Sequence, residues 1–141
     1  SSADDVSFRR LALANRVAGS PLALFTGHEV VVDGAFMSGA DGVVPGLANV
    51  DAPTYVKMYK AYREGDWETV RTEQDKATEL MEIAFVPQGV VGPAAGVGAF
   101  KTAMQLLGTI ETNTMCVPLP TLTGENVERV AEVLRRVGQL A

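Results

Sequence analysis

The pattern of apolar and polar positions predicts two short buried strands that alternate with helices in the first half of the chain. Residues 21–27 form an apolar run without polar alternation, which is typical of a strand covered on both faces in a parallel sheet. Residues 42–46 form a second such run, which Pro45 and Gly46 end. The segment 28–37 between them precedes a helix-exit sequence, so we expect a short helix there although its valines favour a strand.

Helices are expected on either side of these strands and throughout the second half. Residues 4–18 carry acidic residues in the first turn and basic residues in the body, and Ser2 stands where an N-cap is expected. Asp51 is expected to cap a helix that ends near residue 64. After a turn at Gly65, Asp66 is expected to cap a long amphipathic helix. The remaining expectations are a loop over 87–98, a helix over 99–107, an extended segment over 116–120, and a last helix over 125–137 that Thr123 caps.

Length and composition sharpen this α/β interpretation. The 141 residues are one domain's worth, yet a complete (β/α)8 barrel needs roughly 200–250 residues. The 47% content of hydrophobic residues is that of a packed globular chain and excludes intrinsic disorder. Two strands alone do not form a stable parallel sheet with both faces covered, so the predicted sheet is too small for the helices around it.

Charge and cysteine content exclude several classes of function. A net charge of −5 disfavours binding to nucleic acid and to anionic membranes, and no apolar run approaches the ~18 residues of a transmembrane helix. The single cysteine, Cys116, allows no internal disulfide, so we expect a reducing, cytoplasmic setting. Residues 1–5 contain neither an initiator Met nor a basic region, so we expect neither a signal peptide nor a natural translation start there.

Side chains able to carry chemistry are sparse. His28, the only histidine, and Glu29 follow the end of the first predicted strand, the edge at which α/β folds place their sites, although a plain rim role fits equally well. Cys116 is expected to be a small core residue rather than a nucleophile. Lys101 lies in apolar surroundings, which gives it a weak case as an imine-forming amine.

Two further patterns have structural interpretations. The Gly-rich segment 92–102 lacks the glycine before Lys-Thr that a phosphate-binding loop requires, so we expect a flexible loop that leads into a helix. Tyr55, Tyr59 and Tyr62 recur at helical spacing, which is typical of packing rather than of a proton relay.

An ordered set of motifs extends across essentially all 141 residues. Gly27-His28-Glu29, the segment Ser-Gly-Ala-Asp-Gly-Val-Val-Pro-Gly-Leu-Ala-Asn-Val at 38–50, and Tyr-Arg-Glu-Gly-Asp-Trp at 62–67 resemble the seventh and eighth βα units of the dihydrodipicolinate synthase / N-acetylneuraminate lyase family. Residues 98–108 and the later Pro118-Leu119-Pro120 are similar to its C-terminal helical region. No single motif is diagnostic, but the ordered set is specific.

The resemblance implies that the chain is the C-terminal portion of a TIM (β/α)8 barrel. Residues 1–64 are then the last βα units, with about the last two strands, and residues 65–141 are a C-terminal helical region. Residues 1–5 resemble the segment just after the family's Schiff-base lysine, which is expected two residues before Ser1. The catalytic residues are thus expected to be absent from this chain, as are the proton-relay tyrosine and the carboxylate-binding loop.

The resemblance also implies the chemistry and the residues that line the site. Pyruvate, or a 2-oxo acid that yields it, forms an imine with the lysine, without metal or cofactor. This chain would contribute a pocket rim: Gly27, His28 and Glu29 after the seventh strand, and Val44, Pro45 and Gly46 after the eighth. Glu29 matches a carboxylate that can meet polar groups of the second substrate.

Three departures from the family patterns leave the substrate open. Val30 and Gly46 replace an acid and a serine typical of sialic-acid lyases, and Cys116 stands where synthases often carry arginine. A sugar-acid (2-keto-3-deoxy acid) aldolase or dehydratase therefore remains an alternative beside the synthase and N-acetylneuraminate lyase. The missing part of the barrel is expected on a second chain or to have been lost by cleavage, and the family implies a homo-oligomer, tetramer or dimer.

Two alternatives lie outside catalysis. One is a non-catalytic half-barrel that associates with itself through exposed sheet edges, since unpaired strand edges are natural pairing sites. The other is a regulatory module that binds small acids. In either case, and in the family interpretation too, this chain alone is expected to be inactive as a lyase.

Overall fold

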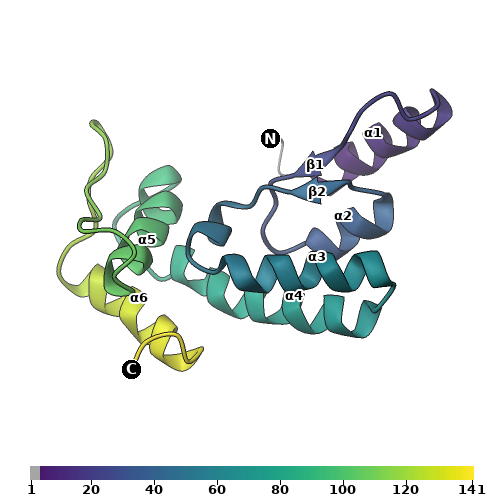
Figure 1. The fold of residues 1–141 in the computed structure, drawn as a ribbon. Coiled ribbons are helices and arrows are strands. Elements are labelled where there is room, and N and C mark those ends of the chain that lie inside the picture. The colour runs from purple at the N-terminus through teal and green to yellow at the C-terminus, as the bar shows by residue number, and fades with distance from the viewer. Residues whose placement is uncertain (1–3) are drawn as a thin grey trace. The chain divides into compact units, whose positions relative to one another are not determined.

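The computed structural model describes residues 4–141, so the expected N-cap Ser2 lies outside the described residues. Contacts divide the chain into two units, the first ending at Ala77 and the second running from Thr78 to Ala141. Figure 1 traces the elements from the N-terminus in purple to the C-terminus in yellow. The sequence-based division into 1–64 and 65–141 concerns barrel and helical parts rather than contact clusters, and it stays a prediction.

Helices accompany a minimal parallel sheet in the first unit. Asp4 caps the first helix by accepting a hydrogen bond from the Val6 amide at 3.0 Å. The helix expected over 28–37 forms from Val32 onward and ends at Gly39, whose φ of 97° is left-handed. The elements are α1 (Asp5–Val17), β1 (Phe25–Thr26), α2 (Val32–Ser38), β2 (Gly42–Val43), the 3-10 helix η1 (Gly46–Asn49), α3 (Ala52–Glu64) and most of α4 (Trp67–Met81).

The two strands pair in parallel, as the sequence predicts, but they are shorter and less covered than expected. Phe25 is opposite Gly42 and Thr26 is opposite Val43, with α2 in the crossover between them. Leu24 and Thr26 are buried, whereas Phe25 is 58% exposed. The expectation of burial on both faces is therefore wrong for this chain, because the described residues cover only one face of the strand.

Capping residues begin α3 and α4 where the sequence predicts. Asp51 accepts a hydrogen bond from the Thr54 amide at 3.3 Å, and Asp66 accepts one from the Thr69 amide at 3.0 Å. These side chains satisfy amide groups that the first helical turn leaves without an intrahelical partner. The turn between the two helices passes through Gly65 with a φ of 78°.

An aromatic cluster lies where α2, α3 and α4 meet. The Phe36 ring stacks on Tyr62 with 4.4 Å between centroids, and Trp67 meets Tyr62 edge-on at 5.8 Å. Tyr59 also contacts Phe36, at 5.9 Å. The packing role predicted for the tyrosine stripe is confirmed for Tyr59 and Tyr62.

A buried carboxylate joins α3 to α4. Glu73 is 2% exposed, and one of its oxygens lies 2.6 Å from Lys57 Nζ and 2.8 Å from Lys76 Nζ. Burial raises the pKa of Glu73, but the hydrogen bonds and charges of the two lysines outweigh it and hold the pKa below its ordinary value of 4.5. Glu73 is thus ionised in the folded chain and connects Lys57 of α3 to α4.

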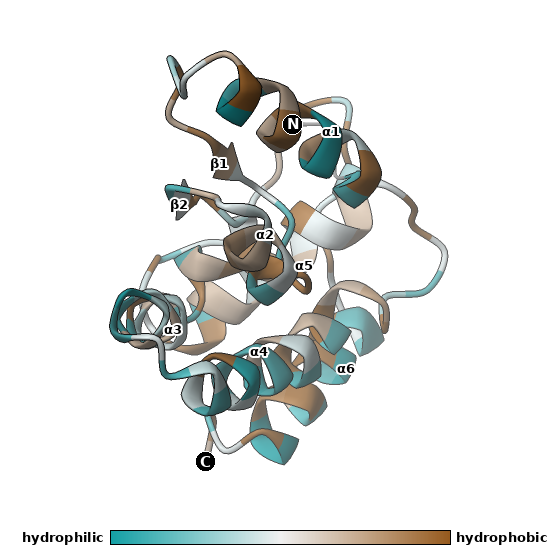
Figure 2. Cartoon of the chain, turned by 90° about the vertical axis from the view of Figure 1, so that its right-hand side faces the viewer, coloured by the Kyte–Doolittle hydropathy of each residue, from teal (hydrophilic) through white to brown (hydrophobic). Residues whose placement is uncertain are grey.

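The second unit is helical. Beyond the last residues of α4 it contains the 3-10 helix η2 (Glu82–Ala84), α5 (Pro93–Leu106) and α6 (Glu125–Arg136). Figure 2 shows hydrophobic and hydrophilic patches on different sides of α6, as expected for a helix with one buried side. The buried residues of this unit include Leu80, Ile83, Ala99, Val130 and Leu134. Within residues 4–141, no helix is both long and apolar enough to cross a membrane.

Three expectations for the second half are wrong. Residues 93–98 belong to α5 rather than to a loop, because proline is well placed at the first position of a helix and Gly92 supplies the positive φ before it. Residues 116–120 do not stay extended: the Val117–Pro118 peptide is cis, and the Leu119 amide donates to the Cys116 carbonyl at 2.9 Å. Gly124, not Thr123, occupies the N-cap position of α6.

The predicted burial of Cys116 is also wrong. Cys116 is exposed in this turn, whereas the neighbouring Met115 is buried. The apolar residues around Cys116 suggested that this segment is buried in the core, but the neighbouring Val117 is 95% exposed.

Replacing Phe36 by alanine tests the aromatic cluster. Phe36→Ala should destabilise the first unit by about 3–5 kcal/mol, because it removes a fully buried ring. The adjacent Met37 is 66% exposed, so Met37→Ala should change stability by less than about 0.5 kcal/mol. Urea unfolding followed by the fluorescence of Trp67, the single tryptophan, measures both variants. Equal losses would contradict the assignment of the core.

Glu73→Gln tests the buried carboxylate through pH. Since the folded pKa is lowered, the contribution of Glu73 is complete above the unfolded pKa near 4.5 and is lost as pH falls through the folded pKa. The variant should be less stable by about 1.5–3 kcal/mol at neutral pH, the range for hydrogen bonds to charged groups. That difference should shrink on acidification. Glu79→Gln, an exposed control on α4, should show neither effect in the same denaturation series.

Candidate functional site

The predicted rim consists of the two loops that follow β1 and β2. Gly27, His28 and Glu29 come directly after β1, and Val44, Pro45 and Gly46 come directly after β2. Because the strands are parallel neighbours, both loops leave the sheet at the carboxyl ends of the strands. The Val44 amide continues the pairing by donating to the Thr26 carbonyl at 2.8 Å.

Glu29 connects the two loops. Its Oε1 accepts a hydrogen bond from the Gly46 amide at 3.0 Å, across 17 residues of sequence. The structure thus brings together the two candidate residues that the resemblance places after different strands. An ionised carboxylate accepts several hydrogen bonds, so this contact leaves Glu29 able to accept from a ligand as well.

His28 lies on a different side of its loop from this contact. Its Nδ1 is 3.3 Å from Oδ1 of Asp5 in the first turn of α1, and its side chain is 29% exposed. The His28 amide donates to the Thr26 hydroxyl at 3.2 Å. The imidazole therefore faces the start of α1, whereas Glu29 faces β2.

The residues after β2 contribute mainly main-chain groups to the rim. Val44 is 71% exposed, and Pro45 is buried and precedes η1 with an extended backbone. Gly46 opens η1 and donates its amide to Glu29. None of these six rim residues carries an amine side chain that could form an imine.

Two residues that the sequence analysis did not assign to the site hold Glu29 in place. The Tyr55 hydroxyl donates to the Glu29 carbonyl at 3.1 Å, and Gln74 Nε2 donates to the same oxygen at 3.2 Å. A signal for Gln74 was present: it stands at spacings of 4 and 3 between the buried Val70 and Ala77, so it lies on the buried side of α4, beside Glu73. Tyr55 carried no comparable signal, because it resembled the packing tyrosines beside it.

Electrostatics keep Tyr55 in its donor form. Burial first, and then the negative charges of Glu29 and Asp51, raise the pKa of the Tyr55 phenol well above its ordinary value of 10.0. The hydroxyl therefore stays protonated at physiological pH and remains able to donate to the Glu29 carbonyl.

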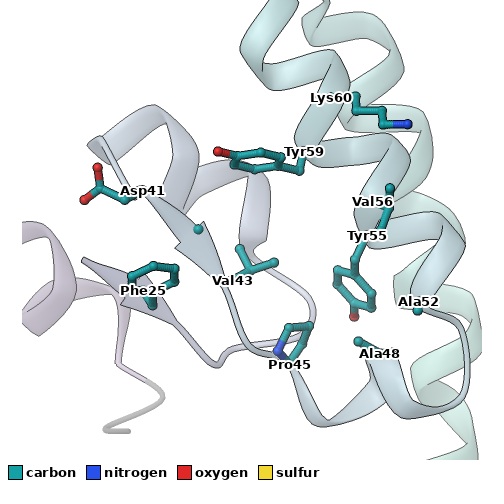
Figure 3. Close-up of a pocket in the computed structure, with 11 residues that line it drawn as sticks. Phe25, Asp41, Val43, Pro45, Ala48, Ala52, Tyr55, Val56, Tyr59 and Lys60 are labelled. Carbon is teal, nitrogen blue, oxygen red and sulfur yellow. The ribbon is translucent and has the colours of Figure 1, made fainter. Parts of the chain in front are cut away.

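Hollows flank both edges of the sheet. On the β2 side, a cavity of about 620 Å³ separates the strand from α3, and Figure 3 shows Val43 and Pro45 on one side of it and Tyr55 and Val56 on the other. It is lined by Phe25, Asp41, Gly42, Val43, Pro45, Ala48, Ala52, Tyr55, Val56, Tyr59 and Lys60. On the β1 side, a smaller cavity of about 360 Å³ is lined by Asp4, Asp5, Ser7, Phe8, Leu11 and residues 23–27.

The remaining candidate residues lie in the second unit. The Lys101 ammonium donates to the Thr114 carbonyl, which gives this lysine a structural role in the loop after α5. The Gly-rich segment is largely the first half of α5 rather than a phosphate-binding loop. Among the residues that the structure describes, no three His, Cys, Asp or Glu side chains gather as metal ligands would.

Comparison with known proteins places this geometry in a family. The family model described as "Dihydrodipicolinate synthetase family" matches residues 3–137. The 4-hydroxy-tetrahydrodipicolinate synthase of Archaeoglobus fulgidus is 27% identical over 120 residues, which are 85% of this chain and 39% of that protein. The enzyme of the same name from Kineococcus radiotolerans is 29% identical over 122 residues, 86% of this chain and 38% of its own length.

Solved structures agree with this assignment. Dihydrodipicolinate synthase from Bacteroides thetaiotaomicron superposes with a TM-score of 0.86 at 26% identity, over 96% of this chain and 44% of that one. The enzyme from Thermotoga maritima gives a TM-score of 0.82 at 25% identity, over 99% and 45%. The chain spans about two fifths of the length of the curated relatives it matches. Over nearly its whole length, this chain belongs to the dihydrodipicolinate synthetase family.

Proposed function

We propose that this chain is the C-terminal part of a Schiff-base-forming lyase of the dihydrodipicolinate synthase type, a TIM barrel that another polypeptide segment completes. The observation that carries the proposal is the family match over 3–137 in a chain that covers only 39% of a matched relative. The substrate is pyruvate or a 2-oxo acid, and the imine-forming lysine belongs to the part of the barrel that this chain does not contain.

The open sheet supports a partnership with the rest of a barrel. Both sides of the two-stranded sheet have hollows, of which the one beside β2 is lined largely by apolar groups, and no third strand pairs with β1 or β2 among the described residues. Leu11 and Leu13 of α1 are about half exposed, at 47% and 56%. Apolar surface of this kind is expected where further strands and helices pack.

In the assembled enzyme, the rim of this chain binds and orients the second substrate. Glu29 accepts hydrogen bonds from its polar groups, and the backbone around Val44 and Gly46 shapes the pocket. A synthase acting on an aldehyde partner is the leading assignment. A sugar-acid aldolase or dehydratase, or an N-acetylneuraminate lyase, is the alternative within the same chemistry, and a cytoplasmic location and a homo-oligomeric assembly belong to the same proposal.

Borohydride reduction in the presence of pyruvate tests the mechanism. The protein completed with its lysine-bearing part should acquire one reduced pyruvate adduct, detected by mass spectrometry of the intact chains and mapped by proteolysis. This chain alone should acquire none, although it contains Lys57, Lys60, Lys76 and Lys101. Absence of an adduct on the completed protein, or an adduct on Lys101, would overturn the assignment.

The alternative of a half-barrel that associates with itself rests on the same open edges. Val56 lines the cavity beside β2 and is 52% exposed, so Val56→Glu places a charge in the hollow without disturbing the core. Burying a carboxylate in an apolar contact costs free energy even with Lys60 four residues along the helix, so association through this edge should weaken more than about tenfold.

The matched control is Val91→Glu, because Val91 is 84% exposed in the second unit. Native mass spectrometry distinguishes the two hypotheses: loss of a complex with a lysine-bearing polypeptide supports the lyase, and loss of a complex containing only this chain supports self-association. Unchanged association in Val56→Glu would show that this edge is not an interface.

A further inference from the structure

Gln74 is a buried side chain whose amide bonds to three main-chain groups, one in the rim loop and two in the first turn of α2. Besides donating to the Glu29 carbonyl, its Oε1 accepts from the Val32 amide at 2.8 Å and from the Asp33 amide at 3.3 Å. The side chain is in α4, 41 to 45 residues away in sequence, and Gln74 is 4% exposed. The partners fix which way the amide points, since a flipped amide would set its NH2 group against two N–H donors.

These bonds replace a missing helix cap. The N-cap residue of α2, Val31, has no side chain that can accept a hydrogen bond, so the first amides of α2 need an acceptor from elsewhere. Gln74 Oε1 supplies it. The start of α2 and the carbonyl of Glu29 are thereby held at one point of α4.

Glu29 is bonded through two separate groups, its main-chain carbonyl and its side-chain carboxylate. Its main-chain carbonyl is bonded by Tyr55 of α3 and Gln74 of α4, while its side chain reaches the Gly46 amide after β2. The Lys57–Glu73 contact joins α3 to α4 near these donors. The two helices thus present Tyr55 and Gln74 together to one carbonyl oxygen.

We infer that Gln74 is a positioning residue for Glu29: it fixes the main chain of the rim loop so that the Glu29 carboxylate meets the Gly46 amide that follows the neighbouring strand. Its importance for substrate binding rests on the proposed function, whereas the coupling itself is a property of this chain. A side chain that only capped α2 would leave the Glu29–Gly46 contact unaffected.

Amide hydrogen exchange by NMR on the full chain separates these roles. Gln74→Met keeps the length of the side chain and removes its hydrogen bonds, so exchange should accelerate at Val32 and Asp33 and also at Gly46, by about two- to tenfold for the loss of one hydrogen bond. Glu29→Ala supplies the reference rate for a Gly46 amide that has lost its acceptor.

Tyr55→Phe removes the other donor to the Glu29 carbonyl and keeps the ring. It should accelerate exchange at Gly46 while leaving Val32 and Asp33 unchanged, and it remains informative if Gln74→Met does not fold. Acceleration confined to Val32 and Asp33 in Gln74→Met, or an unchanged Gly46 amide in both variants, would overturn the inference.

Asn113→Leu is the matched control for general destabilisation. Asn113 is also a buried amide, bonded at 2.9 Å to the Thr102 hydroxyl and the Leu122 carbonyl, but it belongs to the second unit. It should leave the Gly46 exchange rate unchanged, and an equal acceleration there would count against a specific role for Gln74. Pyruvate trapping tests the proposed function, because it concerns a lysine outside this chain. Hydrogen exchange tests the present inference, so each can fail independently of the other.

Discussion

The arrangement of the rim depends on one residue, Glu29, which is hydrogen-bonded through both its main-chain carbonyl and its side-chain carboxylate. Its carbonyl oxygen accepts from two helices that come later in the chain, and its carboxylate accepts from the backbone after the neighbouring strand. The sheet alone would not fix these loops, because each strand contributes only two residues. The helical pair α3 and α4 therefore acts as the rigid support on which the strand ends are arranged.

Local signals in the sequence were sufficient for most helices and for the pairing of the strands. Asp51 and Asp66 cap their helices as predicted, and the exit sequence after residue 38 outweighed the strand preference of the valines before it. The start of α5 was missed because the segment 87–98, rich in glycine and proline, was interpreted as a loop, although proline is favourable in the first turn of a helix. The exposure of Cys116 was not predicted, because apolar neighbours do not show on which side of a turn a residue lies.

The candidate site was predictable only in part. That the residues after two parallel strands lie near one another follows from topology, and the Glu29–Gly46 contact is consistent with it. The contribution of Tyr55 and Gln74 was not predicted, because it depends on contacts that span 26 and 45 residues. A polar residue at a buried helical position, as Gln74 is, indicates such a contact but does not identify its partner.

The shortness of the strands has a consequence for recognition. A two-residue edge offers very few main-chain donors and acceptors, so a neighbouring strand gains little from the backbone ladder that usually joins strands. Discrimination between a correct and an incorrect neighbour must then come from the shape of the side chains that enter the hollows beside Phe25 and Val56. The same brevity limits indiscriminate strand addition, so an open sheet of this kind is selective by the fit of its side chains and is poorly suited to template aggregation.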